Sequence, residues 1–216
     1  MRNYADKQDL IFSHSRDFSG CDLSGIDLRA VDLSGVNFLG ADLRGANLSG
    51  SMLTGANLRE ANLSGSILIG ANLREANLMQ AVVSEANLID ADLTQANLCG
   101  AVLWRSQFCG TNFSRASLCG VDLSEADLSE ACLIEASLIE AKLIRANLAG
   151  AKLCGAILLE ADLTDANLIG ADLTWANLTS ANLTEARLWG SKIIYTKLRD
   201  AIMPDGTIQE PQIAFI

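Results

Sequence analysis

The chain has 216 residues, of which 50% are hydrophobic and only 5% aromatic, and its formal net charge is −10. Its apolar residues are mostly Ala and Leu and are spread evenly, so they never form the roughly 18-residue apolar run of a membrane helix. The negative net charge argues against direct nucleic-acid binding, which depends on Lys and Arg. An acidic surface can bind basic partners, or it can simply keep the protein soluble.

Residues 1–15 come before any regular pattern. The first seven residues lack the apolar stretch of a secretion signal, so we expect a cytoplasmic protein. Leu10, Ile11 and Phe12 lie just before the first repeat. We therefore predict that residues 1–15 form an N-terminal cap, because an exposed solenoid end promotes end-to-end growth.

A five-residue period then runs without insertion from Arg16 to Asp205, which makes 38 consecutive pentapeptides. The typical unit contains a small residue, Asn or Asp, a central Leu or Phe, and two variable positions, as in Ala71–Glu75; only Val83, Ile193 and Met203 are other central residues. The small residue and the centre are two apart, so both face inward on an extended segment. A helix would turn such Leu residues around all its faces, and a long strand would alternate them between faces, so the chain must turn in every unit.

Glycine marks the position of the turn. Sixteen of the seventeen glycines, from Gly20 to Gly190, occupy the last position of the unit, and Gly206 is the exception. This concentration predicts a corner with positive φ or close backbone approach. A fixed short period over most of a chain indicates a solenoid.

These units resemble the pentapeptide-repeat family, whose motif A-(D/N)-L-x-x is matched by Ala41-Asp42-Leu43, Ala86-Asn87-Leu88 and Ala171-Asp172-Leu173. The resemblance covers residues 16–205. It implies an all-β fold, a right-handed quadrilateral parallel β-helix with four units per coil and about nine to ten coils. The segment 201–206 also resembles the ending of cyanobacterial members of this family.

Columns of residues at a spacing of 20 support such a coil. In one column the charges alternate in sign and would form a ladder of exposed ion pairs: Glu85, Arg105, Glu125, Arg145 and Asp165. In another, stacked amides would form an Asn ladder: Asn37, Asn57, Asn77 and Asn97.

The six cysteines form no C-x-x-C pair and His14 is the single histidine, so we expect no metal site, no cofactor and no catalytic residues. Cys99 and Cys119 would stack closely enough to oxidise, but in a cytosol we expect reduced thiols. Four aspartates of the first coil occupy the same unit position on four faces: Asp17, Asp22, Asp27 and Asp32. They would point apart, and this position favours Asp and Asn for turn hydrogen bonds.

Two surfaces are candidates for partner contact. Trp175 and Tyr195 are 20 residues apart at an outward corner, with Ile134 and Ile194 on the same predicted face. The second surface is an apolar column on another face: Met79, Cys99, Cys119, Ile139 and Leu159. Alternatively, the C-terminal tail folds back over the aromatic residues.

The tail, residues 206–216, breaks the period and carries Pro211, Ile213, Phe215 and Ile216. It either caps the last coil of a monomer or joins two copies into a homodimer. The sequence thus predicts a noncatalytic scaffold for protein–protein interaction. Two alternatives remain: an acidic DNA mimic that binds DNA gyrase or a topoisomerase, as implied by resemblance to gyrase-protecting family members, and a regulator of a cyanobacterial signalling protein.

Overall fold

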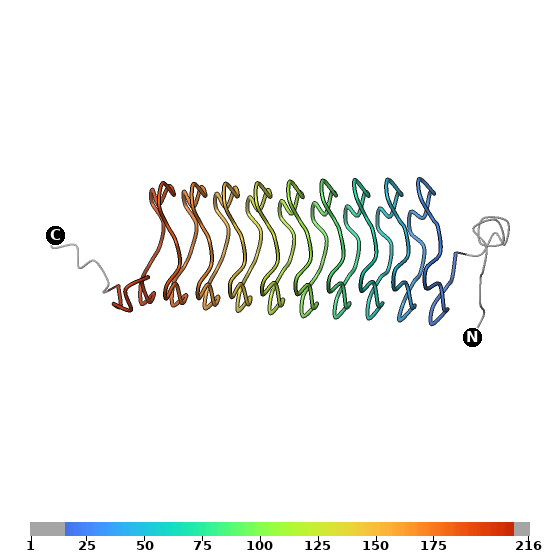
Figure 1. Cartoon of the computed structure of the whole chain (residues 1–216), viewed down its shortest axis with the longest axis horizontal. Helices are drawn as coiled ribbons and strands as arrows, with labels where there is room; N and C mark the ends of the chain where they lie inside the picture. Colours follow the sequence, from blue (N-terminus) through green and yellow to red (C-terminus); the bar gives the residue numbers. More distant parts are fainter. Residues whose placement is uncertain (1–15, 210–216) are drawn as a thin grey trace.

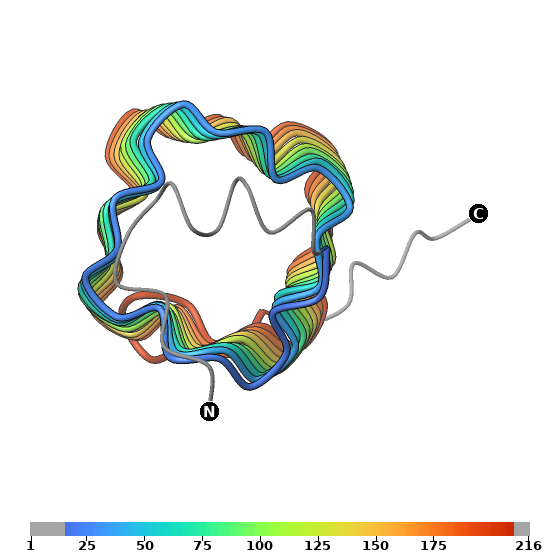
Figure 2. The ribbon, with the colours of Figure 1, turned by 90° about the vertical axis from the view of Figure 1, so that its right-hand side faces the viewer.

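The computed structural model describes residues 16–209 as a rod of stacked coils (Figure 1). These residues contain no helix and no strand of several residues; regular structure consists of single-residue parallel bridges between positions 20 apart. The bridges run from Asp17↔Asn37 to Asn182↔Ile202. One coil therefore contains four pentapeptides, and the 20-residue coil that the charge and Asn columns indicated is confirmed. Viewed along the rod, the coils superpose into a four-sided outline (Figure 2).

Each pentapeptide ends in a tight turn. The N–H of the next unit's small residue donates to the carbonyl of the central residue, as from Ala71 to Leu68 at 3.0 Å. The last position has a positive φ in every unit from Gly20 to Asp200, whether or not it is glycine. A positive φ at the third residue of a four-residue turn is the feature of a type II turn and explains why glycine gathers there. The predicted corner is confirmed.

Three further N–H groups of each unit join the coils. In the unit 71–75, the N–H of Asn72 donates to the preceding coil at 2.9 Å. The N–H groups of Leu73 and Glu75 donate to the following coil at 2.7 and 3.0 Å. A buried or half-buried amide without a partner costs free energy, so this ladder selects in-register stacking of the coils.

The remaining N–H belongs to the residue after the centre, and the Asn or Asp side chain accepts it. Asn72 Oδ1, for example, accepts from the N–H of Arg74 at 3.1 Å. The same bond joins Asp22 to Ser24 and Asp162 to Thr164, each at 3.1 Å. The prediction that this position favours Asn and Asp for turn hydrogen bonds is confirmed.

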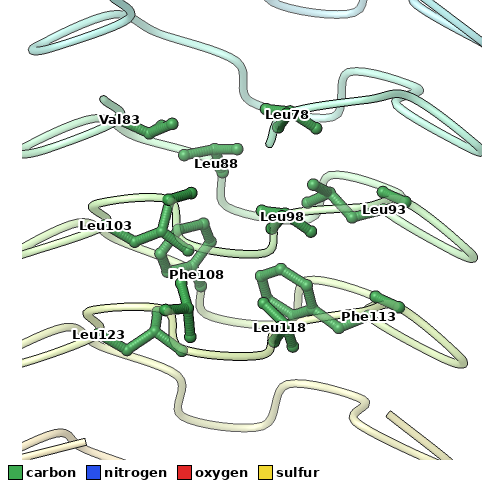
Figure 3. Close-up of a cluster of buried hydrophobic side chains, with 14 of the residues drawn as sticks. Leu78, Val83, Leu88, Leu93, Leu98, Leu103, Phe108, Phe113, Leu118 and Leu123 are labelled. Atoms are coloured by element: carbon green, nitrogen blue, oxygen red, sulfur yellow. The ribbon is translucent and has the colours of Figure 1, made fainter. Parts of the chain in front are cut away.

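The interior holds the central residues and the small residues between them. Central side chains from neighbouring units and coils meet along the axis of the rod, as Leu98, Phe108 and Leu118 do in Figure 3. Phe108 and Phe113 contact edge to face, with ring centroids 5.2 Å apart. Most central side chains are fully buried. Where Ser replaces Ala at the small position, its hydroxyl donates to a carbonyl, as Ser51 does to Leu48 at 2.7 Å.

The regular stacking stops after Ile202. Residues 200–209 turn back as a hairpin, in which Ile208 forms an antiparallel bridge with Ile202. Met203 N–H donates to Thr207 at 2.7 Å, and Gln209 N–H donates to Ala201 at 2.9 Å. The predicted N-terminal cap of residues 1–15 lies outside the described residues, and so do the tail residues 210–216.

The side-chain acceptor of the turn is tested by Asn72→Ala. This change leaves the N–H of Arg74 without its partner, and we expect the free energy of unfolding to fall by about 1 kcal/mol. Urea unfolding followed by circular dichroism measures it. Lys152→Ala is the matched control, because Lys152 occupies the same unit position and has no acceptor to lose. Equal losses in both variants would contradict the role of the amide.

The positive φ is tested by Gly120→Ala. A Cβ there would meet no atom within 4 Å, so the change isolates the backbone conformation, whose φ is 61°. We expect a loss of about 1 kcal/mol in the free energy of unfolding. Ser180→Gly, at a φ of 57°, should give a gain of up to about the same size. Unchanged urea midpoints in both variants would show that φ does not select glycine.

Candidate interaction surfaces

Trp175 and Tyr195 form an exposed aromatic stack near the C-terminal end of the rod. Both occupy the last position of a unit, and the N–H of Trp175 donates to Ile194 in the next coil at 2.9 Å. The ring centroids are 4.3 Å apart with an interplanar angle of 20°. The side chains remain 61% and 69% exposed. Two stacked rings held by adjacent coils present a rigid apolar surface to the solvent.

The predicted isoleucine neighbours lie at different distances from this stack. Ile194 is exposed and directly precedes Tyr195 in the chain. Ile134 is also exposed but lies three coils before Ile194, and therefore roughly 14 Å away at the usual spacing of β-strands. We define the aromatic patch as Trp175, Ile194 and Tyr195; Ile134 is separate from it.

The second candidate surface is the apolar column of Met79, Cys99, Cys119, Ile139 and Leu159. Backbone bonds join its members coil to coil, such as Gly100 N–H to Cys119 at 2.9 Å and Gly120 N–H to Ile139 at 2.8 Å. All five side chains are half-buried. The column is therefore less accessible than the aromatic patch, whose three side chains are exposed.

All the cysteines among residues 16–209 are free. Burial raises the pKa of the Cys99 thiol, and the stacked Cys119 thiol adds to the change. Cys119 Sγ lies 3.3 Å from the hydroxyl of Ser137. A raised pKa lowers the fraction of reactive thiolate, so Cys99 is a poor nucleophile.

The charge ladder is shorter than the sequence predicted. Glu125 lies between Arg105 at 2.7 Å and Arg145 at 3.2 Å, and the hydrogen bond from Arg105 lowers the pKa of Glu125. Glu85 and Asp165 form no ion pair among residues 16–209. The Arg105 guanidinium also stacks over the Trp104 ring, at 4.1 Å from the ring centroid.

The Asn column was predicted correctly only at its start. Asn57 Nδ2 donates to Asn37 at 2.8 Å, and Asn37 Nδ2 donates in turn to Asp17 at 2.8 Å. A second ladder, which the sequence reasoning missed, joins Asn167 to Asn147 and Asn147 to Asp127, both at 2.9 Å. In both ladders the first residue is an Asp, whose carboxylate accepts the first amide.

The four aspartates of the first coil lie on separate faces, and each carboxylate accepts from its own turn. Within residues 16–209, no three His, Cys, Asp or Glu side chains gather as metal ligands would. His14 lies outside the described part. No helix in residues 16–209 is long and apolar enough to cross a membrane.

The sequence reasoning missed the open C-terminal end of the rod. Ile193 is a central residue and was expected to be buried, yet 49% of it is exposed because no coil follows. A groove at this end is lined by Ile193, Tyr195, Lys197, Leu198, Arg199 and Gln209, among others. Ser191 and Thr196 at the small position did not signal this exposure, because Ser51, Ser66, Ser106 and Thr111 occupy the same unit position and are buried.

The family described as pentapeptide repeats (8 copies) matches nearly the whole solenoid in six overlapping or adjacent ranges: residues 17–50, 47–84, 86–124, 122–158, 156–192 and 171–205. The chain is a pentapeptide-repeat protein. The match and the observed coils together confirm the right-handed quadrilateral β-helix.

Solved structures include similar proteins. HetL, a pentapeptide repeat protein involved in heterocyst differentiation regulation from the cyanobacterium Nostoc sp. strain PCC 7120, is 37% identical. The match covers 97% of this chain and 100% of HetL, with a TM-score of 0.50. Rfr23 from the cyanobacterium Cyanothece 51142 is 30% identical over 57% of this chain and 92% of its own, with a TM-score of 0.35. The likeness to HetL makes this pentapeptide-repeat protein one of the cyanobacterial type.

QnrB1, a plasmid-mediated fluoroquinolone resistance protein, shares the fold at 22% identity and a TM-score of 0.50. That match covers 81% of this chain and 90% of QnrB1. Among curated proteins, none matches this pentapeptide-repeat protein in sequence.

The Asp carboxylates that accept hydrogen bonds in the turns make the stability of the fold depend on pH. The hydroxyl and N–H of Ser24 lower the pKa of Asp22, and Ser34 lowers the pKa of Asp32 in the same way. A lowered pKa in the folded state contributes stability above the unfolded pKa, and this stability is lost as the pH falls through the folded pKa. We therefore expect the melting temperature to decrease when the pH is lowered below about 4.

The variant Asp22→Asn, Asp32→Asn keeps both acceptor oxygens but cannot be protonated. It should lose less of its melting temperature than the wild type between about pH 5 and pH 2. Thermal unfolding followed by circular dichroism measures the difference. An identical acid dependence in the two proteins would show that these carboxylates do not contribute.

Proposed function

We propose that this pentapeptide-repeat protein is a noncatalytic scaffold that binds a protein partner through the aromatic patch. The stacked, exposed rings of Trp175 and Tyr195 are the observation that carries the proposal. Large rings that stay exposed on a rigid surface can be buried by a partner with little loss of conformational entropy. The half-buried apolar column offers a second, weaker contact surface.

The proposed biological role is the regulation of a signalling protein in a cyanobacterium. Its support is the likeness to HetL, which is 37% identical over nearly all of both chains and is described as involved in heterocyst differentiation regulation. The free cysteines of residues 16–209 favour action in the reducing cytoplasm.

The alternative function is an acidic mimic of DNA that binds gyrase or a topoisomerase. The net charge of −10 favours it. Arginines interrupt the acidic surface, however, as where Arg105 and Arg145 flank Glu125 and Arg115 lies 2.7 Å from Glu135. Supercoiling by purified gyrase is the test, and activity that is unchanged at micromolar concentrations of this protein would exclude the mimic.

The scaffold is tested by affinity capture from a lysate of the source organism, followed by mass spectrometry. The bait variant Trp175→Ala, Ile194→Ser removes two of the three aromatic-patch side chains. Trp104→Ala is the matched control, because it removes a tryptophan from another side of the rod. We expect a partner that the wild type and the control retain and that the patch variant enriches at least tenfold less.

Circular dichroism verifies that each bait is folded. The variant Met79→Ser, Ile139→Ser tests the apolar column in the same assay. If neither variant changes the capture of any protein, the scaffold proposal fails.

A further inference from the structure

The last coil presents an open main-chain edge at the C-terminal end of the rod. In the coil before it, the N–H of Leu183 donates to Ile202 at 2.8 Å, as the ladder requires. The equivalent N–H groups of the last coil have no following coil. Within residues 16–209, those of Leu188, Gly190, Ile193 and Tyr195 donate no hydrogen bond. Such a row of donors is a template for strand addition.

One side of this edge already shows how a strand is added. The hairpin brings Ile208 against Ile202 in antiparallel pairing. The bonds from Asp200 N–H to Gln209 at 3.0 Å and from Gln209 N–H to Ala201 at 2.9 Å complete it. The edge therefore accepts an antiparallel strand on one of the four sides, and the opposite side, which contains Ile193, remains open.

The groove at this end supplies side-chain contacts for such a strand. Ile193 and Leu198 provide an apolar floor, and Tyr195 lies beside them. Lys197 and Arg199 line the same groove and are exposed. A strand that alternates apolar and polar side chains would place one set on the floor and the other toward the solvent.

The charge of the end favours an acidic occupant. The position that holds Asp17, Asp27 and Asp32 in the first coil holds Lys197, Arg187 and Lys192 in the same columns of the last coil. Lys192 pairs with Asp172 at 3.3 Å, whereas Arg187 and Lys197 form no ion pair among residues 16–209. A basic end on a protein of net charge −10 attracts acidic groups.

A second copy of the chain fits this end poorly. Two C-terminal ends face to face would bring the basic residues of both copies together. Head-to-tail stacking needs exposed apolar side chains on the first coil, but Phe18, Leu23, Leu28 and Leu33 are at most 2% exposed. The occupant is therefore a different segment.

We propose that the C-terminal end of the rod binds an extended segment of a partner protein, with alternating acidic and apolar residues, as an antiparallel added strand along the side that contains Ile193. The main-chain carbonyls of the segment accept from the N–H groups of Ile193 and Tyr195, and its acidic side chains reach Lys197. The inference deepens the proposed scaffold function and rests on it, because it specifies the chemistry of a partner at a surface next to the aromatic patch.

The experiment measures binding of a fluorescein-labelled synthetic peptide of alternating Glu and Val to the full chain by fluorescence anisotropy. We expect saturable binding that weakens as salt is added, and at least tenfold weaker binding of an alternating Lys and Val peptide. Ile193→Pro removes a donor that no hydrogen bond within the fold uses and should weaken binding at least tenfold. Lys197→Glu should weaken it to a similar extent.

Two matched controls should bind the peptide as the wild type does. Thr54→Pro places proline in a turn of the second coil, far from the C-terminal end, and Lys152→Glu reverses a charge at the unit position that Lys197 occupies. Loss of binding in these controls, equal binding of the Lys and Val peptide, or no binding at all would overturn the proposal.

Two further results would assign the edge to other occupants and so also overturn it. One is binding that appears only when Ile213, Phe215 and Ile216 are replaced by Ser, which would make the chain's own tail the occupant. The other is self-association in analytical ultracentrifugation that Ile193→Pro abolishes. Trp175→Ala removes a ring of the aromatic patch that does not line the groove. If this variant still binds the peptide, the groove binds its segment independently of the aromatic patch, so each of the two proposals can fail without the other.

Discussion

Satisfaction of the five backbone N–H groups of each pentapeptide is the constraint on which the rest of the structure depends. Three groups join adjacent coils, one closes the turn, and in the units that carry Asn or Asp the side-chain oxygen accepts the last. A single-residue bridge per side is weak, but the bridges repeat along the rod at every position of the column. The motif thus satisfies the backbone N–H groups as well as burying the apolar side chains.

This constraint places the chemistry of the protein on its outside. Central Leu and Phe residues and small residues fill the interior, so variation is confined to positions that face the solvent. Side chains at those positions meet their equivalents in adjacent coils. The stack of Trp175 on Tyr195 and the bridging of Glu125 by two arginines arise from this arrangement, since neither pair is adjacent in the chain.

The two ends of the rod differ because a ladder of this kind has direction. Central N–H groups donate toward the C-terminal end, so the last coil is left with donors, and the hairpin of residues 200–209 pairs with one of its sides. The central side chains of the first coil are buried, whereas Ile193 of the last coil is half exposed. The C-terminal end of the rod thus combines N–H donors that residues 16–209 leave unpaired, an apolar floor and basic side chains, and it lies next to the aromatic patch.

The sequence by itself determined the period, the inward Leu and Phe residues, the turn marked by glycine and the 20-residue coil, because a strict repeat allows few ways to bury one face and satisfy the backbone. Only the tertiary structure decided which members of a column touch. Arg105 stacks on Trp104 and pairs with Glu125 but not with Glu85, because a long side chain can reach several neighbours and contacts only some of them. In the Asn column, the amides of Asn37 and Asn57 form a hydrogen bond. The tertiary structure also decided the open end at Ile193, since burial there depends on a following coil that the local pattern cannot reveal.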